Sequence, residues 1–293
     1  MGRVRCASVS TSLHILDGAM GTELERRGVE LPLPLWTSHA LLHAPEEIKA
    51  VHRDCVAAGA TILTAATFRT HARTVAAAGI DADPADLVHR AIELARDAAG
   101  DSVQVFGSVG PLEDCYSPEL TPEFDVCYAE QRAHLEHMKD AGADGVLLET
   151  FGTRRGASAA ARAARDVFPE RWMISFLCRP GATPGTLFVG TPLVDVLPTL
   201  DGAMAIGLTC TPAPELANHL RVLRTLVDDD IPLIAQGNTA TIDDHGAWVA
   251  TNAESPEEYA GYARTWRDLG ASYIGGCCGT TPATIQAISA ALT

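Results

Sequence analysis

The chain has 293 residues, of which 47% are hydrophobic and 20% charged, fractions that are typical of a soluble globular protein. Its 22 basic and 37 acidic residues leave a net charge of −15, which opposes binding to nucleic acids and to anionic membranes. No stretch is long and apolar enough to cross a bilayer, and no secretory signal opens the chain, so we expect a cytoplasmic protein. Its eight cysteines are therefore expected to be reduced thiols or metal ligands instead of disulfides.

Eight short apolar segments, rich in β-branched residues, predict strands. Most of them are continuously apolar instead of alternating, which is typical of parallel strands covered on both faces. In chain order these segments are Leu13–Asp17, Thr61–Thr67, Val103–Val109, Gly145–Glu149, Trp172–Leu177, Met204–Thr209, Pro232–Gln236 and Ser272–Gly276.

Longer amphipathic segments between the strands predict helices, several of which begin at proline or end just before glycine. They cover Glu46–Ala58, Pro84–Ala99, Glu123–Ala141, Arg154–Val167, Pro214–Val227, Pro256–Leu269 and Pro282–Leu292. The segment Arg179–Gly190 is rich in glycine and proline and predicts a loop, with a short helix expected afterwards at Pro192–Leu200.

This alternation of strands and helices predicts an α/β protein, a single-domain (β/α)8 TIM barrel over residues 13–293, with residues 1–12 as an N-terminal extension. A doubly wound parallel sheet is the alternative. No linker or block of like charges divides the chain. In a barrel of this kind the functional residues lie at the C-terminal ends of the strands, so polar residues at those ends are candidates for chemistry.

Three cysteines stand at predicted strand ends. Cys277 and Cys278 are adjacent and fenced by glycines, and Cys210 closes another apolar segment. Successive side chains of a regular strand point to opposite faces, but the flanking glycines permit the bend that lets two neighbours converge. Three thiolates leave one position free on a tetrahedral zinc ion, the arrangement of a catalytic site. The alternative is that these thiols are small buried hydrophobic groups.

Two acidic residues also end predicted strands. Asp17 precedes a flexible turn, where a carboxylate can hold an ammonium group or cap the helix that follows. Glu149 ends an apolar strand and needs a partner, which is either a substrate cation or an arginine such as Arg154. Trp36 offers a ring that can face a cationic methyl donor, or is an ordinary core tryptophan.

Other common chemistries have no motif here. The sequence contains no Walker loop, no GxGxxG that opens a helix and no GxSxG elbow. Its only lysines, Lys49 and Lys139, fall inside predicted helices, whereas a Schiff-base aldolase needs a lysine at a strand end.

Taken together and in order, the motifs resemble those of the homocysteine S-methyltransferases. The resemblance covers nearly the whole chain, and its most specific part is the Gly-Gly-Cys-Cys turn with a cysteine upstream at this separation. It rests on segments Leu16–Leu24, Ala58–Thr61, Ala66–Phe68, Gly107–Pro111, Glu149–Thr150, Gly207–Cys210 and Gly275–Gly279.

This resemblance implies a zinc-dependent barrel enzyme in which Cys210, Cys277 and Cys278 bind Zn²⁺ and the sulfur of homocysteine takes the open position. It also implies that Asp17 and Glu149 hold the amino-acid end of homocysteine. The further candidate substrate contacts are Gly18, Thr67, Asn238 and Trp36.

The reaction implied is transfer of a methyl group to homocysteine, which gives methionine. Relatives that use methylfolate and cobalamin need additional modules, for which this chain has no room. S-methylmethionine or S-adenosylmethionine is therefore the expected donor. The expected partners are small molecules, a thiol and a methyl donor.

Several positions depart from the family pattern. Thr209 stands where Asn usually precedes the first zinc cysteine, Gln236-Gly237 replaces Tyr-Pro before Asn238, and Arg69 follows Thr67-Phe68 where betaine-using relatives have an aromatic residue. These changes keep open the same chemistry with a different thiol or selenol acceptor, or a different donor. A non-catalytic metal-binding barrel is the third hypothesis.

Overall fold

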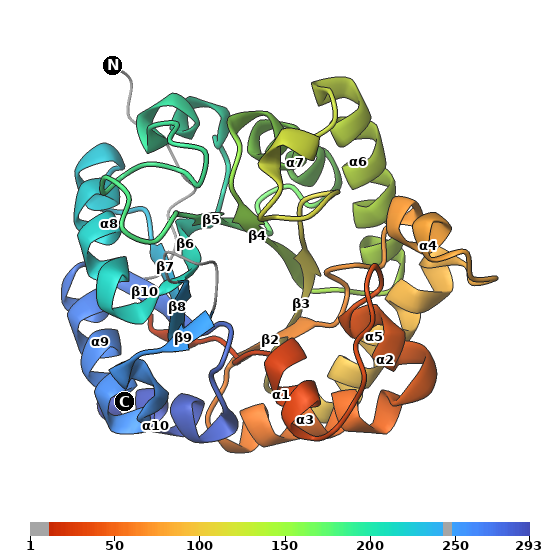
Figure 1. Cartoon of the computed structure of the whole chain (residues 1–293), viewed down its shortest axis with the longest axis horizontal. Helices are drawn as coiled ribbons and strands as arrows, with labels where there is room; N and C mark the ends of the chain where they lie inside the picture. The colour runs from red at the N-terminus through yellow and green to blue at the C-terminus, as the bar shows by residue number, and fades with distance from the viewer. Residues whose placement is uncertain (1–11, 243–247) are drawn as a thin grey trace.

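The computed structural model describes residues 12–242 and 248–293, and their eight parallel strands form one sheet ringed by helices (Figure 1). The strand order is β1-β10-β7-β6-β5-β4-β3-β2, and a bridge between Leu16 and Ile62 joins the two ends. The predicted (β/α)8 barrel is confirmed and the doubly wound sheet is excluded. The predicted extension, residues 1–12, lies outside the described residues except for Ser12.

The strands agree with the predicted segments. They are β1 (His14–Ile15), β2 (Ile62–Ala65), β3 (Gln104–Val109), β4 (Gly145–Phe151), β5 (Trp172–Leu177), β6 (Ala205–Pro212), β7 (Leu233–Asn238) and β10 (Ala271–Gly276). Because all neighbouring pairs are parallel, all the C-terminal strand ends meet at one mouth of the barrel.

The outer helices also follow the prediction, with ends displaced by at most one residue. Hydroxyl and carboxylate side chains cap several of them, as Asp83 does for Ala85 N–H and Thr281 does for Thr284 N–H. These helices are α3 (Pro45–Ala57), α5 (Pro84–Ala99), α6 (Phe124–Asp140), α7 (Arg154–Val167), α8 (Ala213–Leu226), α9 (Pro256–Asp268) and α10 (Pro282–Leu292).

Some elements were not predicted. Short helices α1 (Gly21–Arg26), α2 (Thr37–His43) and α4 (Ala72–Ala78) follow the first two strands, and β8 (Ala240–Ile242) pairs with β9 (Trp248–Ala250) as an antiparallel hairpin. These pieces are too short to show a clear periodicity.

The short helix predicted at Pro192–Leu200 is wrong. Two separate 3₁₀ turns, η2 (Leu193–Asp195) and η3 (Leu197–Thr199), occupy that segment. Pro198 lies inside the second turn and has no amide hydrogen to donate to the preceding turn, so one continuous α-helix does not form across the segment.

The lower part of the barrel interior is entirely apolar. One buried residue from or directly beside each of the eight strands fills it, and we call this set the barrel floor: Leu16, Ile62, Phe106, Leu147, Met173, Ala205, Ile234 and Tyr273. Two residues further along a strand the side chain faces the same way, so the next inward layer holds Ser108, Glu149, Ser175 and Gln236. The interior therefore changes from apolar to polar towards the mouth.

No helix within the described ranges combines the length and the apolar composition that a membrane span requires.

Candidate metal and substrate site

Three thiols converge at the mouth of the barrel. The Sγ atoms of Cys210, Cys277 and Cys278 all lie within 4.8 Å of one another. Cys278 Sγ lies 3.8 Å from Cys210 Sγ and 4.0 Å from Cys277 Sγ. Two zinc–sulfur bonds of ~2.3 Å at a tetrahedral angle separate the sulfur atoms by about 3.8 Å. The spacing of the cluster therefore fits a soft metal ion bound by thiolates.

Unusual backbone conformations bring these thiols together. Cys210 has φ 55°, and the register between β6 and β7 shifts between Thr209 and Thr211, which turns the thiol out of the regular pleat. Gly279 has φ 84° and ends the turn that carries the adjacent cysteines. A left-handed conformation at a non-glycine residue such as Cys210 is strained, and such strain is characteristic of functional sites.

Asn238 joins the two cysteine segments. Its Nδ2 donates to the carbonyl oxygen of Cys210 at 2.9 Å, and its Oδ1 accepts from the backbone N–H of Cys278 at 3.1 Å. The side chain is 1% exposed. Both ends of the amide are thus held by backbone at β6 and after β10, so the residue positions the cysteines. Its predicted contact with substrate stays a prediction.

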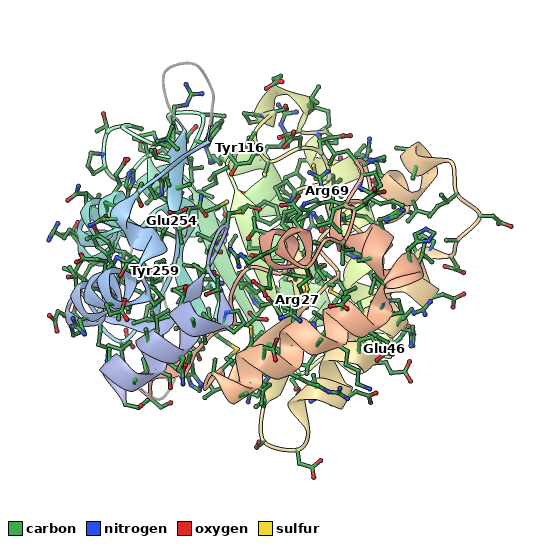
Figure 2. All side chains as sticks on the ribbon, turned by 60° about the horizontal axis from the view of Figure 1, so that its bottom comes forward. Arg27, Glu46, Arg69, Tyr116, Glu254 and Tyr259 are labelled. Atoms are coloured by element: carbon green, nitrogen blue, oxygen red, sulfur yellow. The ribbon has the colours of Figure 1, made fainter. Side chains whose placement is uncertain are left out.

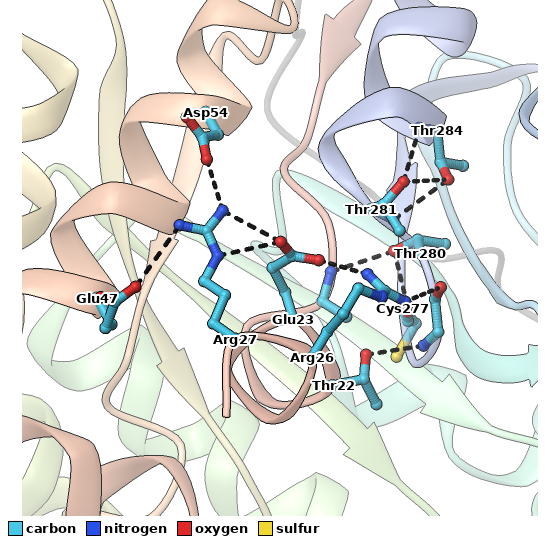
Figure 3. A network of polar contacts seen from close by, with 12 residues as sticks. Thr22, Glu23, Arg26, Arg27, Glu47, Asp54, Cys277, Thr280, Thr281 and Thr284 are labelled. Atoms are coloured by element: carbon cyan, nitrogen blue, oxygen red, sulfur yellow. Dashed lines mark hydrogen bonds and ion pairs between the residues drawn. The ribbon is translucent and has the colours of Figure 1, made fainter. Parts of the chain in front are cut away.

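Thr280 joins the cysteine turn to the loop after β1. Its hydroxyl donates to the carbonyl oxygen of Cys277 at 2.7 Å and accepts from Ala19 N–H at 3.1 Å (Figure 3). Thr22 adds a second link because its Oγ1 accepts from Gly279 N–H at 2.9 Å. The loop that bears Asp17 and the turn that bears two thiols are therefore joined by hydrogen bonds into one unit.

A charged cluster supports this unit from α1. Glu23 is 7% exposed and pairs with both Arg26 and Arg27, and Arg27 also reaches Asp54 of α3 at 2.5 Å (Figure 3). Arg26 extends towards Gly279, with its Nη2 3.5 Å from the carbonyl oxygen. The cluster holds α1 against α3 beside the cysteine turn.

Asp17 lies buried next to β2. Its carboxylate accepts from Thr64 N–H at 2.8 Å and from Thr64 Oγ1 at 2.9 Å. Burial raises the pKa of Asp17 to about 7 against the opposing effect of these hydrogen bonds, and the charge of Glu149 adds to the increase. The alternative role as a helix cap is wrong, because α1 begins after Met20 and has no side-chain cap.

Glu149 lies on β4 and is partly accessible at the mouth. Ser108 Oγ donates to its Oε1 in a short hydrogen bond, and Ser108 is held in turn by Thr67, whose Oγ1 donates to Ser108 O at 2.8 Å. Desolvation by the barrel wall raises the pKa of Glu149 to about 7. No ion pair joins it to Arg154, which is exposed, so the structural pairing considered above is not formed within the described ranges.

The two carboxyl groups lie close enough for each charge to matter to the other, as the effect of Glu149 on Asp17 shows. Neither has an ion-pair partner among residues 12–242 and 248–293. A cationic ligand placed between them would favour the ionised form of both.

Trp36 and Gly18 line the same mouth. The Trp36 ring packs edge-on against Phe68 with centroids 5.9 Å apart, and a side chain at Gly21 would clash with the indole at 2.2 Å. A Cβ at Gly18 would lie 3.1 Å from Thr280 Oγ1. Direct contact of either residue with substrate stays a prediction.

Tyr116 is a site residue that the sequence did not indicate. Its Oη lies 3.2 Å from Cys210 Sγ, and it comes from the loop after β3, which carries no regular pattern. Within the thiol cluster, hydrogen bonds from Cys277 and Cys278 lower the pKa of Cys210 well below its usual value, and the same bonds raise the pKa of Cys278. One thiolate is thus stabilised at Cys210.

Two of the departures from the family pattern lie beside the cysteines. Thr209 pairs in register with Gln236 across β6 and β7, and both side chains are buried. Among the described residues, no hydrogen-bond partner reaches Gln236 Oε1 or Ser175 Oγ, both of which face the barrel interior. Buried polar atoms usually have a partner, so this wall offers unused hydrogen-bonding capacity to a ligand.

Comparison with known proteins gives consistent matches. The sequence profile described as "Homocysteine S-methyltransferase" matches residues 14–292. Homocysteine S-methyltransferase YbgG of Bacillus subtilis is 32% identical over 95% of this chain and 94% of its own. Homocysteine S-methyltransferase of Escherichia coli is 34% identical over 94% of both chains.

The similarity extends to a solved structure. The metallated form of the homocysteine methyltransferase MmuM from E. coli superposes with a TM-score of 0.81 at 32% identity, and the match covers 95% of this chain and 96% of that one. A metallated relative of this similarity agrees with the converging thiols described above.

Proposed function

The chain belongs to the homocysteine S-methyltransferase family, a family of methyltransferases, and from this we propose that it transfers a methyl group to the sulfur of homocysteine, giving methionine. We assign the activity to the barrel of residues 13–293, with residues 1–12 as an extension. The observation that carries the proposal is the convergence of three thiols at the mouth, beside two carboxyl groups that have no ion-pair partner in the part of the chain that the structure describes.

Cys210, Cys277 and Cys278 are the proposed metal ligands, and zinc is the proposed metal. Their spacing matches tetrahedral thiolate coordination, and a set of three soft ligands selects zinc over the hard cations Mg²⁺ and Ca²⁺. Bound there, zinc would supply a Lewis acid that deprotonates a thiol at neutral pH without changing its oxidation state.

Asp17 and Glu149 are proposed to hold the ammonium group of the amino-acid acceptor. Each is anchored by a hydroxyl residue on a neighbouring strand, Thr64 for Asp17 and Ser108 for Glu149, so the pair has a defined orientation. Because their pKa values are raised to about 7, both carboxyl groups are partly protonated at neutral pH. A bound cation favours the carboxylate form of each. The ligand is thereby fixed at its amino end.

The chemical step is a displacement at carbon. The acceptor sulfur forms a bond to the methyl carbon, the bond from that carbon to the donor sulfonium breaks, and the electron pair leaves with the donor as a neutral thioether. The rigid unit formed by the Asp17 loop and the cysteine turn would keep the acceptor aligned for this in-line attack. S-methylmethionine or S-adenosylmethionine is the proposed donor.

The experiment combines metal analysis with a transfer assay. The purified protein should contain about one zinc per chain, expected of a three-thiolate site. It should form methionine from homocysteine with S-methylmethionine or S-adenosylmethionine, as followed by mass spectrometry. Stoichiometric zinc without transfer to any thiol would contradict the methyltransferase proposal and favour a non-catalytic metal-binding barrel.

A second candidate keeps the chemistry and changes the acceptor. In the wall beside Thr209, Gln236 Oε1 and Ser175 Oγ are buried without a hydrogen-bond partner among the described residues, and an acceptor with an extra polar group would satisfy them. A screen of amino-acid thiols and selenols under identical conditions separates the candidates. A clear preference for homocysteine would exclude this second acceptor.

A further inference from the structure

Arg69 is a charged residue at the barrel mouth that no carboxylate neutralises. It lies four residues after the end of β2, and its Nε is buried without a hydrogen-bond partner among the described residues. Among residues 12–242 and 248–293 no ion pair involves its guanidinium. Its guanidinium lies over the ring of Phe68, with the guanidinium carbon 5.9 Å from the ring centroid.

The contrast with Arg73 makes this absence informative. Arg73 lies four residues later and pairs with Glu130 at 2.6 Å and with Glu113 at 2.9 Å. The loop after β3 and helix α6 thus supply two carboxylates to Arg73, whereas no carboxylate within the described ranges pairs with Arg69. A desolvated guanidinium N–H without an acceptor is unfavourable, and an anionic ligand would relieve it.

The position of Arg69 points to the substrate. It and Tyr116 follow the C-terminal ends of β2 and β3, and both lie toward the upper side of the view in Figure 2. Burial raises the pKa of the Cys115 thiol to about 12, and the charge of Arg69 opposes this increase whereas Cys277 of the cluster adds to it, so both groups lie near the same thiol. Phe68 beneath the guanidinium packs against Trp36, so Arg69 belongs to the wall of the same mouth.

We propose that Arg69 binds the carboxylate of an amino-acid substrate at the mouth of the barrel. The planar guanidinium accepts a carboxylate in bidentate geometry, which a lysine does not reproduce. Asp17 and Glu149 supply the opposite charge for the ammonium end, so the mouth matches a zwitterion. The inference rests on the proposed function, and both the methyl donor and the acceptor thiol carry such a carboxylate.

Arg69 would also select among donors. A sulfonium cation without a carboxylate meets only repulsion from the guanidinium, whereas an amino-acid sulfonium brings its own counter-charge. The substrate class is therefore α-amino acids with a free carboxylate, and carboxamides of the same compounds are poor substrates.

The test is a double-mutant cycle in which one change removes the Arg69 guanidinium and the other removes the substrate carboxylate. We would measure kcat/KM for the wild type and Arg69→Gln with S-methylmethionine and with its α-carboxamide. A second arm compares homocysteine with its α-carboxamide. In one arm the kcat/KM of the wild type should be on the order of 10- to 100-fold lower for the carboxamide than for the acid. The kcat/KM of Arg69→Gln should be nearly the same for both. The arm that shows this difference identifies whether Arg69 binds the carboxylate of the methyl donor or that of the acceptor.

Controls keep the result decisive. Arg69→Lys preserves the charge and should recover only part of the preference for the acid. Arg90→Gln, which removes an exposed arginine of α5, should leave the ratios unchanged. Equal penalties in wild type and Arg69→Gln in both arms would overturn the proposal.

A binding readout separates this proposal from the proposed function. Calorimetric titration of the zinc-loaded protein with homocysteine, methionine and their carboxamides needs no turnover. If no donor supports transfer but the acids still bind more tightly than the amides only when Arg69 is present, the carboxylate site stands and the methyl-transfer proposal fails. Equal affinity for acids and amides in both proteins would contradict the carboxylate site.

Discussion

The two ends of the barrel interior carry opposite kinds of side chain, apolar at the floor and polar at the mouth. In the barrel floor every strand contributes a buried apolar side chain, at most 2% exposed. At the mouth, one to five residues further along the chain from the floor residues, the side chains are thiols, carboxyl groups and hydroxyl groups. Leu147 and Glu149 are neighbours on one face of β4, yet the first is packed and the second is desolvated with a raised pKa.

The difference shows where the free energy of folding is gained and where part of it is given up. The floor is stabilised by apolar burial and close packing. The mouth keeps Cys210 in a left-handed conformation and buries Asp17 without a counter-charge. The floor should therefore respond to substitution by losing stability, and the mouth by losing metal and activity.

The largest effect is expected from a substitution that disrupts the mouth and leaves the floor intact. Cys278→Ser removes one of three proposed metal ligands, so bound zinc and methyl transfer should be lost together, with activity reduced more than about 1,000-fold. Metal analysis and the transfer assay measure both. The matched control is Cys127→Ser on α6, whose thiol donates to Pro122 O away from the cluster and should be dispensable. Retained activity in Cys278→Ser would refute its assignment as a ligand.

The next largest effect is expected from a substitution that disrupts the floor and leaves the mouth intact. Met173→Ala leaves a cavity among buried floor residues and should lower the free energy of unfolding by about 2–5 kcal/mol. Denaturant unfolding measures this change. At temperatures where the variant stays folded, its zinc content should match the wild type. A parallel loss of zinc in folded protein would show that floor and mouth are coupled.

A smaller effect concerns pH and Asp17. An ordinary aspartate titrates near pH 4, but the folded protein holds this proton up to about pH 7. Between those values the folded state binds a proton that the unfolded state has lost, so the carboxyl group costs stability as pH rises. Asp17→Asn cannot titrate and should gain about 4 kcal/mol relative to wild type between pH 4 and pH 8.

Unfolding of metal-free wild type and Asp17→Asn at several pH values measures this difference. Loss of one Thr64 hydrogen bond in the variant adds an offset that does not change with pH. Buried histidines with lowered pKa values, His52, His71 and His134, titrate in both proteins and cancel. A pH-independent difference would contradict the raised pKa.

The smallest effect is expected from a substitution that tests the hydrogen bonds of Thr280 at the mouth. Thr280→Val keeps the shape but removes the hydroxyl that joins Cys277 O to Ala19 N–H. We expect a loss of about 1–2 kcal/mol in stability and roughly 10-fold weaker zinc binding. Thr280→Ser should recover most of both. Chelator competition measures zinc affinity, and equal affinity in Thr280→Val and wild type would show that the link does not position the thiols.

Much of the architecture was predictable from local patterns. Continuous apolar segments and helix-end residues are properties of neighbours in the chain, so all eight strands and the main helices were placed correctly. The convergence of Cys277 and Cys278 was also predictable, since flanking glycines permit the bend. The helix at Pro192–Leu200 was wrong because Pro198 stops the helical ladder there.

The partners of the site residues were not predictable. Asn238 was expected to contact substrate, but its amide clamps Cys210 and Cys278. Glu149 was considered for pairing with Arg154, but it bonds Ser108 on the neighbouring strand. Tyr116 reaches Cys210 from an irregular loop that shows no periodicity.

The sequence by itself determined the barrel and the three thiols, because periodicity, glycine placement and residue chemistry are local. Only the tertiary structure decided that, among the described residues, Arg73 has ion-pair partners and Arg69 has none, and that the pKa values of Asp17 and Glu149 rise to about 7. The reason is physical. Ion pairing and desolvation depend on which side chains from distant segments meet, and closing the barrel brings the ends of eight strands together at one mouth.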